Sequence, residues 1–100
     1  MIDLTRIEGF DWDDGNSRKS VDKHGVTQAE TERAFLNEPL LLLEDVKHSA
    51  DEPRFHALGQ TGEGRLVHIT FTLRGGGRLI RVISARDMNR KERFRYEHET

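Results

Sequence analysis

The chain has 100 residues, of which 34% are hydrophobic and 34% charged, and its formal net charge at pH 7 is -2. This length predicts a single domain, 1–100, that can build its core without metal or disulfide support, and the absence of cysteine excludes a disulfide framework and a thiolate zinc site. No apolar run approaches the roughly 20 residues of a membrane span, and the first residues lack the apolar segment of a signal peptide. We therefore expect a cytoplasmic protein with no membrane partner.

The charge is divided unevenly between the two halves of the chain. Residues 1–50 hold 6 basic and 11 acidic side chains, a net of -5, whereas residues 51–100 hold 10 basic and 7 acidic ones, a net of +3. Such a split lets one surface attract a polyanion while another repels it. The alternative is that solvated helix faces simply carry charge.

The first half of the chain predicts two helices. The first runs from about residue 14 to residue 23 and ends at Gly25, because glycine adopts the left-handed conformation after a helix without a Cβ clash. Thr27-Gln-Ala-Glu30 then has the pattern of a capping box, in which threonine and glutamate satisfy each other's free backbone donors. It opens a second helix, which extends to about Leu36.

The second half predicts strands and a closing helix. Val67, Ile69, Phe71 and Leu73 alternate with polar residues, so one face of this strand lies in the core. Residues 40–44 have the pattern of a strand or of the apolar end of a turn, and with them the expected strands are 40–44, 55–59, 67–73 and 79–85. The last two are joined as a hairpin by Arg74-Gly-Gly-Gly-Arg78. Asn89-Arg-Lys-Glu92 is a second capping pattern and begins a helix that extends to about residue 99.

This order of elements predicts the α+β class, with two N-terminal helices, a mostly antiparallel four-stranded sheet and a C-terminal helix. We expect the helices to pack on one face of the sheet and to leave the other face open. His68, Thr70 and Thr72 belong to the open face, and Arg81 of the neighbouring strand joins them there. An arginine in that position can hold a phosphate.

Cations gather in residues 78–96, where a strand carrying arginines passes directly into an arginine-rich helix that contains Tyr96. A protein with a net negative charge has little reason to concentrate cations unless that region handles an anion. Phosphate esters are the commonest such anion, and RNA is the leading candidate.

Several short strings occur in a fixed order and spacing over nearly the whole chain. They are Phe10-Asp-Trp-Asp13, Lys23-His-Gly-Val26, Glu38-Pro-Leu40, His48-Ser49 followed by Asp51-Glu52 and Arg54-Phe55, Gly59, Gly64-Arg65, and Arg81-Val-Ile-Ser-Ala-Arg86 with Glu92-Arg93 and Tyr96. Taken together, these strings resemble the BrnT family of toxins.

The resemblance implies a RelE-like ribonuclease fold and a toxin that cuts RNA, either free or on the ribosome, and so inhibits translation and arrests growth. It also implies a partner, an antitoxin of the BrnA type with a ribbon-helix-helix DNA-binding region. The two proteins are expected to form a hetero-oligomer that reaches operator DNA only through the antitoxin. No cofactor and no metal ion are expected.

A metal-independent ribonuclease uses the ribose 2′-hydroxyl as its nucleophile. It needs a base for that proton, cations for the charge on the phosphorane, and an acid for the leaving oxygen. Arg81 and Arg86 are the first candidates for phosphate contact, because a guanidinium stays charged and can make two parallel bonds to phosphate. Arg54 and Arg65 come next.

The candidates for proton transfer are His24, His68 and Tyr96, with Lys23 as an electrostatic helper. This choice follows the resemblance, because RelE-like sites rely on basic and tyrosine side chains more than on paired histidines.

Several of these residues also have a structural interpretation. Lys23 and His24 precede Gly25, where cations complement the exposed carbonyls of a helix end. Arg81 can pair with a carboxylate, Arg86 can fix the turn into the last helix, and Tyr96 can pack. The alternative function is therefore a catalytically inactive module that binds RNA or the antitoxin.

Overall fold

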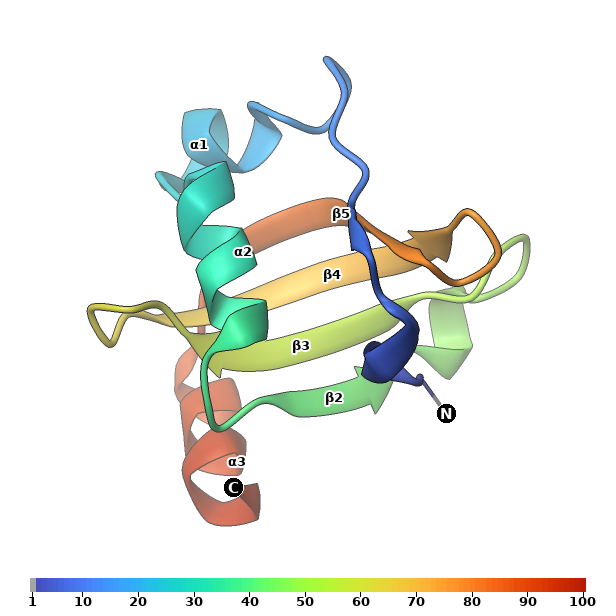
Figure 1. Cartoon of the computed structure of the whole chain (residues 1–100). Coiled ribbons are helices and arrows are strands. Elements are labelled where there is room, and N and C mark those ends of the chain that lie inside the picture. The colour runs from blue at the N-terminus through green and yellow to red at the C-terminus, as the bar shows by residue number, and fades with distance from the viewer. Residues whose placement is uncertain (1) are drawn as a thin grey trace.

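The computed structural model describes residues 2–100 (Figure 1). In chain order the elements are η1 (Leu4–Arg6), β1 (Gly9–Phe10), α1 (Lys19–His24), α2 (Gln28–Leu36), β2 (Leu41–Glu44), η2 (Val46–His48), β3 (Phe55–Gln60), β4 (Leu66–Arg74), β5 (Leu79–Asp87) and α3 (Arg90–Glu99). The strands form one sheet in the order β1-β5-β4-β3-β2. No helix within residues 2–100 is both long and apolar enough to cross a membrane.

The α+β class is confirmed, but the expected four-stranded sheet is wrong, because the sheet has five strands and is mixed. The additional strand is β1, whose Gly9 and Phe10 pair in parallel with Leu79 and Ile80 of β5. The other neighbouring strands are antiparallel. Two residues are too few for an alternation pattern, and the partner strand lies at the other end of the sequence, so no local signal marks this pairing.

The first helix begins later than expected, at Lys19 rather than near residue 14. The cause is Asn16, whose buried side-chain amide donates to the main-chain carbonyls of Asp11 at 3.0 Å and Val82 at 2.9 Å. These bonds hold the segment before α1 in turns against β5, in competition with helical hydrogen bonds. The helix ends at Gly25 with φ of 66°, as predicted.

The other local predictions are confirmed. Both capping boxes form, between Thr27 and Glu30 and between Asn89 and Glu92. The hairpin between β4 and β5 turns through Gly75–Gly77, all with positive φ. The remaining element boundaries lie within two residues of those expected.

The larger core lies between α2 and the sheet face that α2 covers (Figure 1). Val67, Ile69 and Phe71 of β4 are completely buried there, as the alternation predicts. Phe35 of α2 meets Phe71 edge to face, with 5.1 Å between the ring centroids. This packing fixes which side chains of β4 and β5 point to the opposite face.

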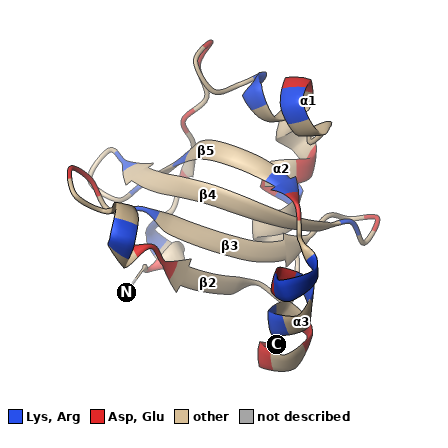
Figure 2. Cartoon of the chain, turned by 180° about the vertical axis from the view of Figure 1, so that it is seen from behind, with Lys and Arg blue, Asp and Glu red and all other residues tan. Residues whose placement is uncertain are grey.

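The expectation that all helices pack on one face and leave the other open is wrong at one end of the sheet. There α3 covers the second face, where Tyr96 and Met88 pack with Leu58 in a smaller core. Strands β2 and β3 place leucines on this face as well, and α3 shields them from water. Figure 2, which views the molecule from behind, shows α3 at this end of the strands. Thr70, farther along β4, is only half-buried.

Candidate active site

Three polar side chains meet where α3 lies over the second face of the sheet. They are His68 of β4, Arg86 of β5 and Glu92 of α3, and we call them the His68–Arg86–Glu92 cluster. His68 and Arg86 are cross-strand partners, so their side chains share a face. Arg86 donates to both carboxylate oxygens of Glu92, at 2.8 and 2.9 Å, and Oε2 of Glu92 lies 3.6 Å from Nε2 of His68.

The capping box of α3 holds Glu92 in this position. Its carboxylate accepts from the backbone N–H of Asn89 at 2.9 Å, and its own N–H donates to the Asn89 side chain at 2.8 Å. Burial alone would raise the pKa of Glu92, but bonds from Arg86 and Asn89 outweigh it and lower the pKa. The same bonds to Glu92 raise the pKa of Arg86. The pair is therefore fully charged at neutral pH.

His68 has the opposite character. The residue is only 9% exposed, and burial lowers its pKa from 6.5 to about 4, although the charge of Glu92 pulls it upward. The ring is therefore neutral at pH 7. Its Nδ1 atom is buried and has no hydrogen-bond partner among residues 2–100.

A second histidine, His56 of β3, lies beside His68 with 4.8 Å between the ring centroids. Its Nε2 is 3.0 Å from a carboxylate oxygen of Asp45, and its Nδ1 is 3.1 Å from the hydroxyl of Thr70. A carboxylate only accepts, so in the neutral ring Nε2 carries the hydrogen and Nδ1 accepts from Thr70. Both nitrogens of His56 are thus engaged, whereas His68 keeps one acceptor without a partner.

A cavity of about 180 Å³ opens at these histidines. Its lining comprises Leu43, His56, Leu58, His68, Lys91, Glu92 and Arg95. Lys91 and Arg95 are exposed cations of α3. The neutral His68 and the cations Lys91 and Arg95 line this cavity, and the carboxylate of Glu92, which also lines it, is paired with Arg86. This arrangement is a suitable environment for a phosphate group.

Arg81 lies on the same sheet face as Arg86 but not beside it. Arg81 is opposite Thr72 and Arg86 is opposite His68. This separation is roughly 13 Å along β4, at about 3.3 Å per residue. Arg81 forms ion pairs with Asp11 at 3.4 Å and Asp13 at 3.0 Å, and the bond to Asp13 raises its pKa. The two arginines therefore occupy separate places, and each has its own carboxylate partner.

The structure does not bring Arg65 or Arg54 to the cluster. Arg65 donates to Asp87 at 2.7 Å, to Glu30 at 3.3 Å and to the carbonyls at the end of α1. It therefore ties α1 and α2 to the end of β5. Arg54 precedes β3 and lines a separate hollow of about 440 Å³ beside η2.

Lys23, His24 and Tyr96 are also accounted for by structural contacts. Lys23 and His24 are exposed in the last turn of α1, as the helix-end interpretation expects. Tyr96 is buried and donates its hydroxyl to the carbonyl of Pro39 at 2.6 Å, and burial raises its pKa. Of the three side chains predicted to transfer protons, His68 is the one that lies beside Arg86.

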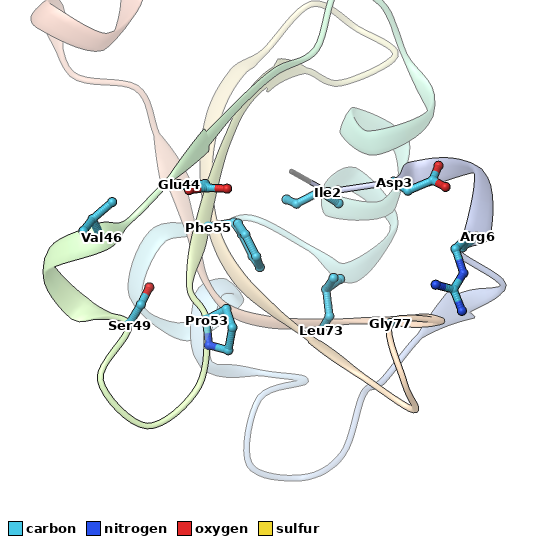
Figure 3. A pocket seen from close by; sticks show the side chains of 10 residues that line it. All are labelled: Ile2, Asp3, Arg6, Glu44, Val46, Ser49, Pro53, Phe55, Leu73 and Gly77. Carbon is cyan, nitrogen blue, oxygen red and sulfur yellow. The ribbon is translucent and has the colours of Figure 1, made fainter.

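A larger cavity, of about 620 Å³, lies elsewhere, between η1 and the start of β3 (Figure 3). Apolar side chains such as Phe55 and Leu73 line it, together with the carboxylates of Asp3 and Glu44 and a single cation, Arg6. A site for a polyanion needs an excess of cations. The smaller cavity beside the cluster is therefore the better candidate.

Sequence reasoning missed His56, Lys91 and Arg95 as site residues. It identified Glu92 as part of a cap and of the strings that carry the family resemblance, but not as a site residue. Period-two alternation does place His56 and Leu58 on one face of their strand, and helical spacing places Lys91 near Arg95. Neither pattern shows that strand and helix meet, because that depends on which face of the sheet α3 covers.

Comparison with known proteins identifies a family whose model matches most of this chain. The model of a family described as the ribonuclease toxin, BrnT, of type II toxin-antitoxin systems matches residues 12–92. The matched segment contains every strand except β1, together with the complete His68–Arg86–Glu92 cluster. No curated protein was found to match the chain.

Proposed function

This chain belongs to the BrnT family of ribonuclease toxins of type II toxin-antitoxin systems, and we propose that it cuts RNA without a metal ion, by attack of the ribose 2′-hydroxyl on the adjacent phosphate. The observation that carries this proposal is the His68–Arg86–Glu92 cluster beside a cavity with two cations, Lys91 and Arg95. A single RelE-like domain spanning 1–100 is part of the same proposal.

In this mechanism His68 removes the proton from the 2′-hydroxyl. Its Nε2 faces the carboxylate of Glu92, so the neutral ring carries its hydrogen there and leaves a lone pair on Nδ1. That atom has no partner among the described residues. The positive ring formed by proton uptake is stabilised by Glu92, 3.6 Å away.

A base with a pKa of about 4 is weak at neutral pH. A phosphate in the cavity corrects this, because a nearby negative charge favours the protonated ring and raises its pKa toward the working pH. Substrate binding thereby activates the base, and the buried Nδ1 has to become accessible from the cavity as RNA enters.

Arg86 stabilises the phosphorane. NH1 and NH2 hold Glu92, and NH1 also donates to the carbonyl of Asp87 at 3.1 Å. The N–H of Nε and the second N–H of NH2 are then left for a phosphate oxygen. Lys91 and Arg95 add positive charge at the exposed side of the cavity. As the bond from the 2′-oxygen to phosphorus forms, the bond to the 5′-oxygen breaks. The products are a 2′,3′-cyclic phosphate and a 5′-hydroxyl, whose proton comes from solvent.

Membership of a type II family implies an antitoxin partner. We propose that this partner is of the BrnA type, with a ribbon-helix-helix region that carries the complex to operator DNA. We also propose that the toxin acts on RNA, free or on the ribosome, and so stops translation. The antitoxin silences the toxin by covering the cations around the cavity, so stripping it away raises cleavage. Unchanged cleavage after its removal would contradict this part of the proposal.

The test is induction of the chain alone in a bacterial host, followed by growth and by the integrity of abundant messenger RNAs. Arg86→Ala is compared with Arg78→Ala, a matched arginine at the hairpin whose exposed pair with Glu8 at 3.5 Å lies outside the cluster. The wild type and Arg78→Ala are expected to arrest growth and cleave RNA, and Arg86→Ala is expected to do neither.

A second variant guards against loss of the fold, because Arg86→Ala leaves Glu92 without its partner. Arg86→Lys keeps a positive charge next to Glu92 but cannot make two parallel bonds to phosphate. It should remain folded by circular dichroism and lose most of the cleavage. Full toxicity of both Arg86 variants at equal expression would place the site elsewhere. Normal growth with wild-type protein would favour the binding module.

A further inference from the structure

We propose that Phe94 is a stacking platform for a base of single-stranded RNA that leaves the cavity across α3. The inference rests on the proposed ribonuclease function and adds a substrate subsite to it. It is carried by an exposed aromatic ring that lies next to the cations of the cavity, on the side of α3 turned away from the sheet.

Phe94 is the most exposed of the phenylalanine, tyrosine and tryptophan residues within 2–100, at 63% exposed. Tyr96 and Glu92 face the sheet, and Phe94 lies two positions from each, so it points to the opposite side of the helix. It therefore contributes nothing to the core formed by Tyr96 and Leu58. One exposed ring is common on protein surfaces, so the inference rests on the ordered stacking of this ring and on the cations beside it.

The ring is held in place by His98. The two rings stack with 4.0 Å between centroids and an interplanar angle of 23°, and Nδ1 of His98 donates to the carbonyl of Phe94 at 2.8 Å. Although His98 stacks on it, Phe94 remains 63% exposed, so the ring is accessible to a base. A preordered ring loses little conformational freedom when a base stacks on it.

Helical spacing places the rings of Phe94 and His98 next to residues that line the cavity. Lys91, which lines the cavity, is three positions before Phe94, and Arg95 is three positions before His98. Residues three or four apart are neighbours on a helix surface. An RNA strand whose phosphate lies beside Arg86 can therefore cross Lys91 and present its next base to Phe94.

The charges around Phe94 suit a polyanion. Arg90, Lys91 and Arg93 are all exposed, and Glu97 is the acidic side chain on this part of the helix. The other acidic residues of α3 are already paired, Glu92 with Arg86 and Glu99 with Arg95 at 2.6 Å. Figure 2 shows this basic helix at the end of the largely uncharged strands.

The geometry specifies the class of RNA. A base can stack on a protein ring only when it is free of its own helix, so the subsite takes single-stranded RNA or a loop and not a duplex. Every base has a flat face, so the platform supplies affinity and position with little preference for sequence.

The experiment titrates the full chain into a single-stranded oligoribonucleotide that contains 2-aminopurine, whose fluorescence falls when it stacks. All riboses carry 2′-fluoro groups, so the RNA cannot be cut. Wild-type protein should quench the fluorescence, and Phe94→Tyr should behave similarly. Phe94→Ala should lose the quenching and bind on the order of 10-fold more weakly, as expected for one base stacked on an aromatic ring. The matched control is Leu36→Ala on α2, another exposed apolar residue at 77% exposed, which should bind normally.

The design separates this inference from the proposed function, because binding is measured without cleavage. If wild-type protein stacks the base but leaves ordinary RNA intact, the result supports the stacking role of Phe94 and contradicts the nuclease mechanism. Equal quenching and affinity for Phe94→Ala, or quenching of a duplex as strong as that of the single strand, would overturn the platform. Phe94→Ala that keeps RNA affinity but loses antitoxin affinity would assign the ring to the antitoxin instead.

Discussion

Replacement of His68 by glutamine should remove a pH dependence of folding that the wild type possesses. Burial lowers the pKa of His68 from 6.5 to about 4 in the folded protein. Between these two values the unfolded chain takes up a proton at this residue and the folded chain does not. Unfolding is therefore favoured as pH falls through this window. Above it both states are neutral, and below it both are protonated.

The size of the effect follows from the two pKa values. Their separation of about 2.5 units corresponds to about 3 kcal/mol of unfolding free energy, at about 1.4 kcal/mol per unit. Only 11% of the side chain is exposed, so solvent screening reduces this little. The wild type should lose about 3 kcal/mol more stability than His68→Gln between neutral pH and the lower end of the window.

Urea unfolding at a series of pH values measures this difference. Carboxylates and the other histidines titrate in both proteins, so their contributions largely cancel when the two curves are subtracted. An NMR titration of the His68 ring provides an independent value. Parallel stability curves, together with a ring that titrates near 6.5, would show that His68 is solvated in the folded protein, and the activation of this base by bound phosphate would then be unnecessary.

Three further predictions test the contacts around the site. Glu92→Gln keeps an acceptor for the capping box but loses the charged pair with Arg86, so we expect a cost of about 2 kcal/mol in urea unfolding; unchanged stability would mean that the pair contributes nothing net. Tyr96→Phe removes the bond to the carbonyl of Pro39 and should cost about 1 kcal/mol while RNA cleavage continues. A folded Tyr96→Phe protein without cleavage would return Tyr96 to the catalytic set. Arg81→Ala should weaken RNA binding at every sequence and reduce the salt-dependence slope by about 1, measured by fluorescence anisotropy; an unaltered slope would mean that Arg81 serves only its pairs with Asp11 and Asp13.

The features that could be predicted from the sequence are those encoded by neighbouring residues. The capping boxes at Thr27 and Asn89 depend on a partner three positions away. The alternation around Ile69 indicates which side of its strand is buried. The glycines after Arg74 indicate a turn whose residues have positive φ. Each of these patterns lies within a short segment of the chain, so it can be interpreted without knowing the rest of the fold.

The features that were missed depend on contacts between distant segments. Gly9 and Phe10 pair with β5, from which they are separated by most of the sequence. Asn16 lies outside the first helix because its side chain bonds to the carbonyl of Val82. The position of α3 on the second sheet face is also non-local, and it creates the site by bringing Glu92 to His68. Arg86 was identified because its charge and its motif are visible in the sequence, whereas its partner was not.

The measurement that tests the central claim most directly is cleavage of RNA by the purified chain, free of antitoxin and in excess chelator, with identification of the product ends. The proposed mechanism predicts that cleavage persists, yields 2′,3′-cyclic phosphate and 5′-hydroxyl ends, is mostly lost in Arg86→Lys, and is absent from RNA with a 2′-deoxyribose at the cleaved position. Cleavage that stops in chelator, or that yields 3′-hydroxyl and 5′-phosphate ends, would contradict it.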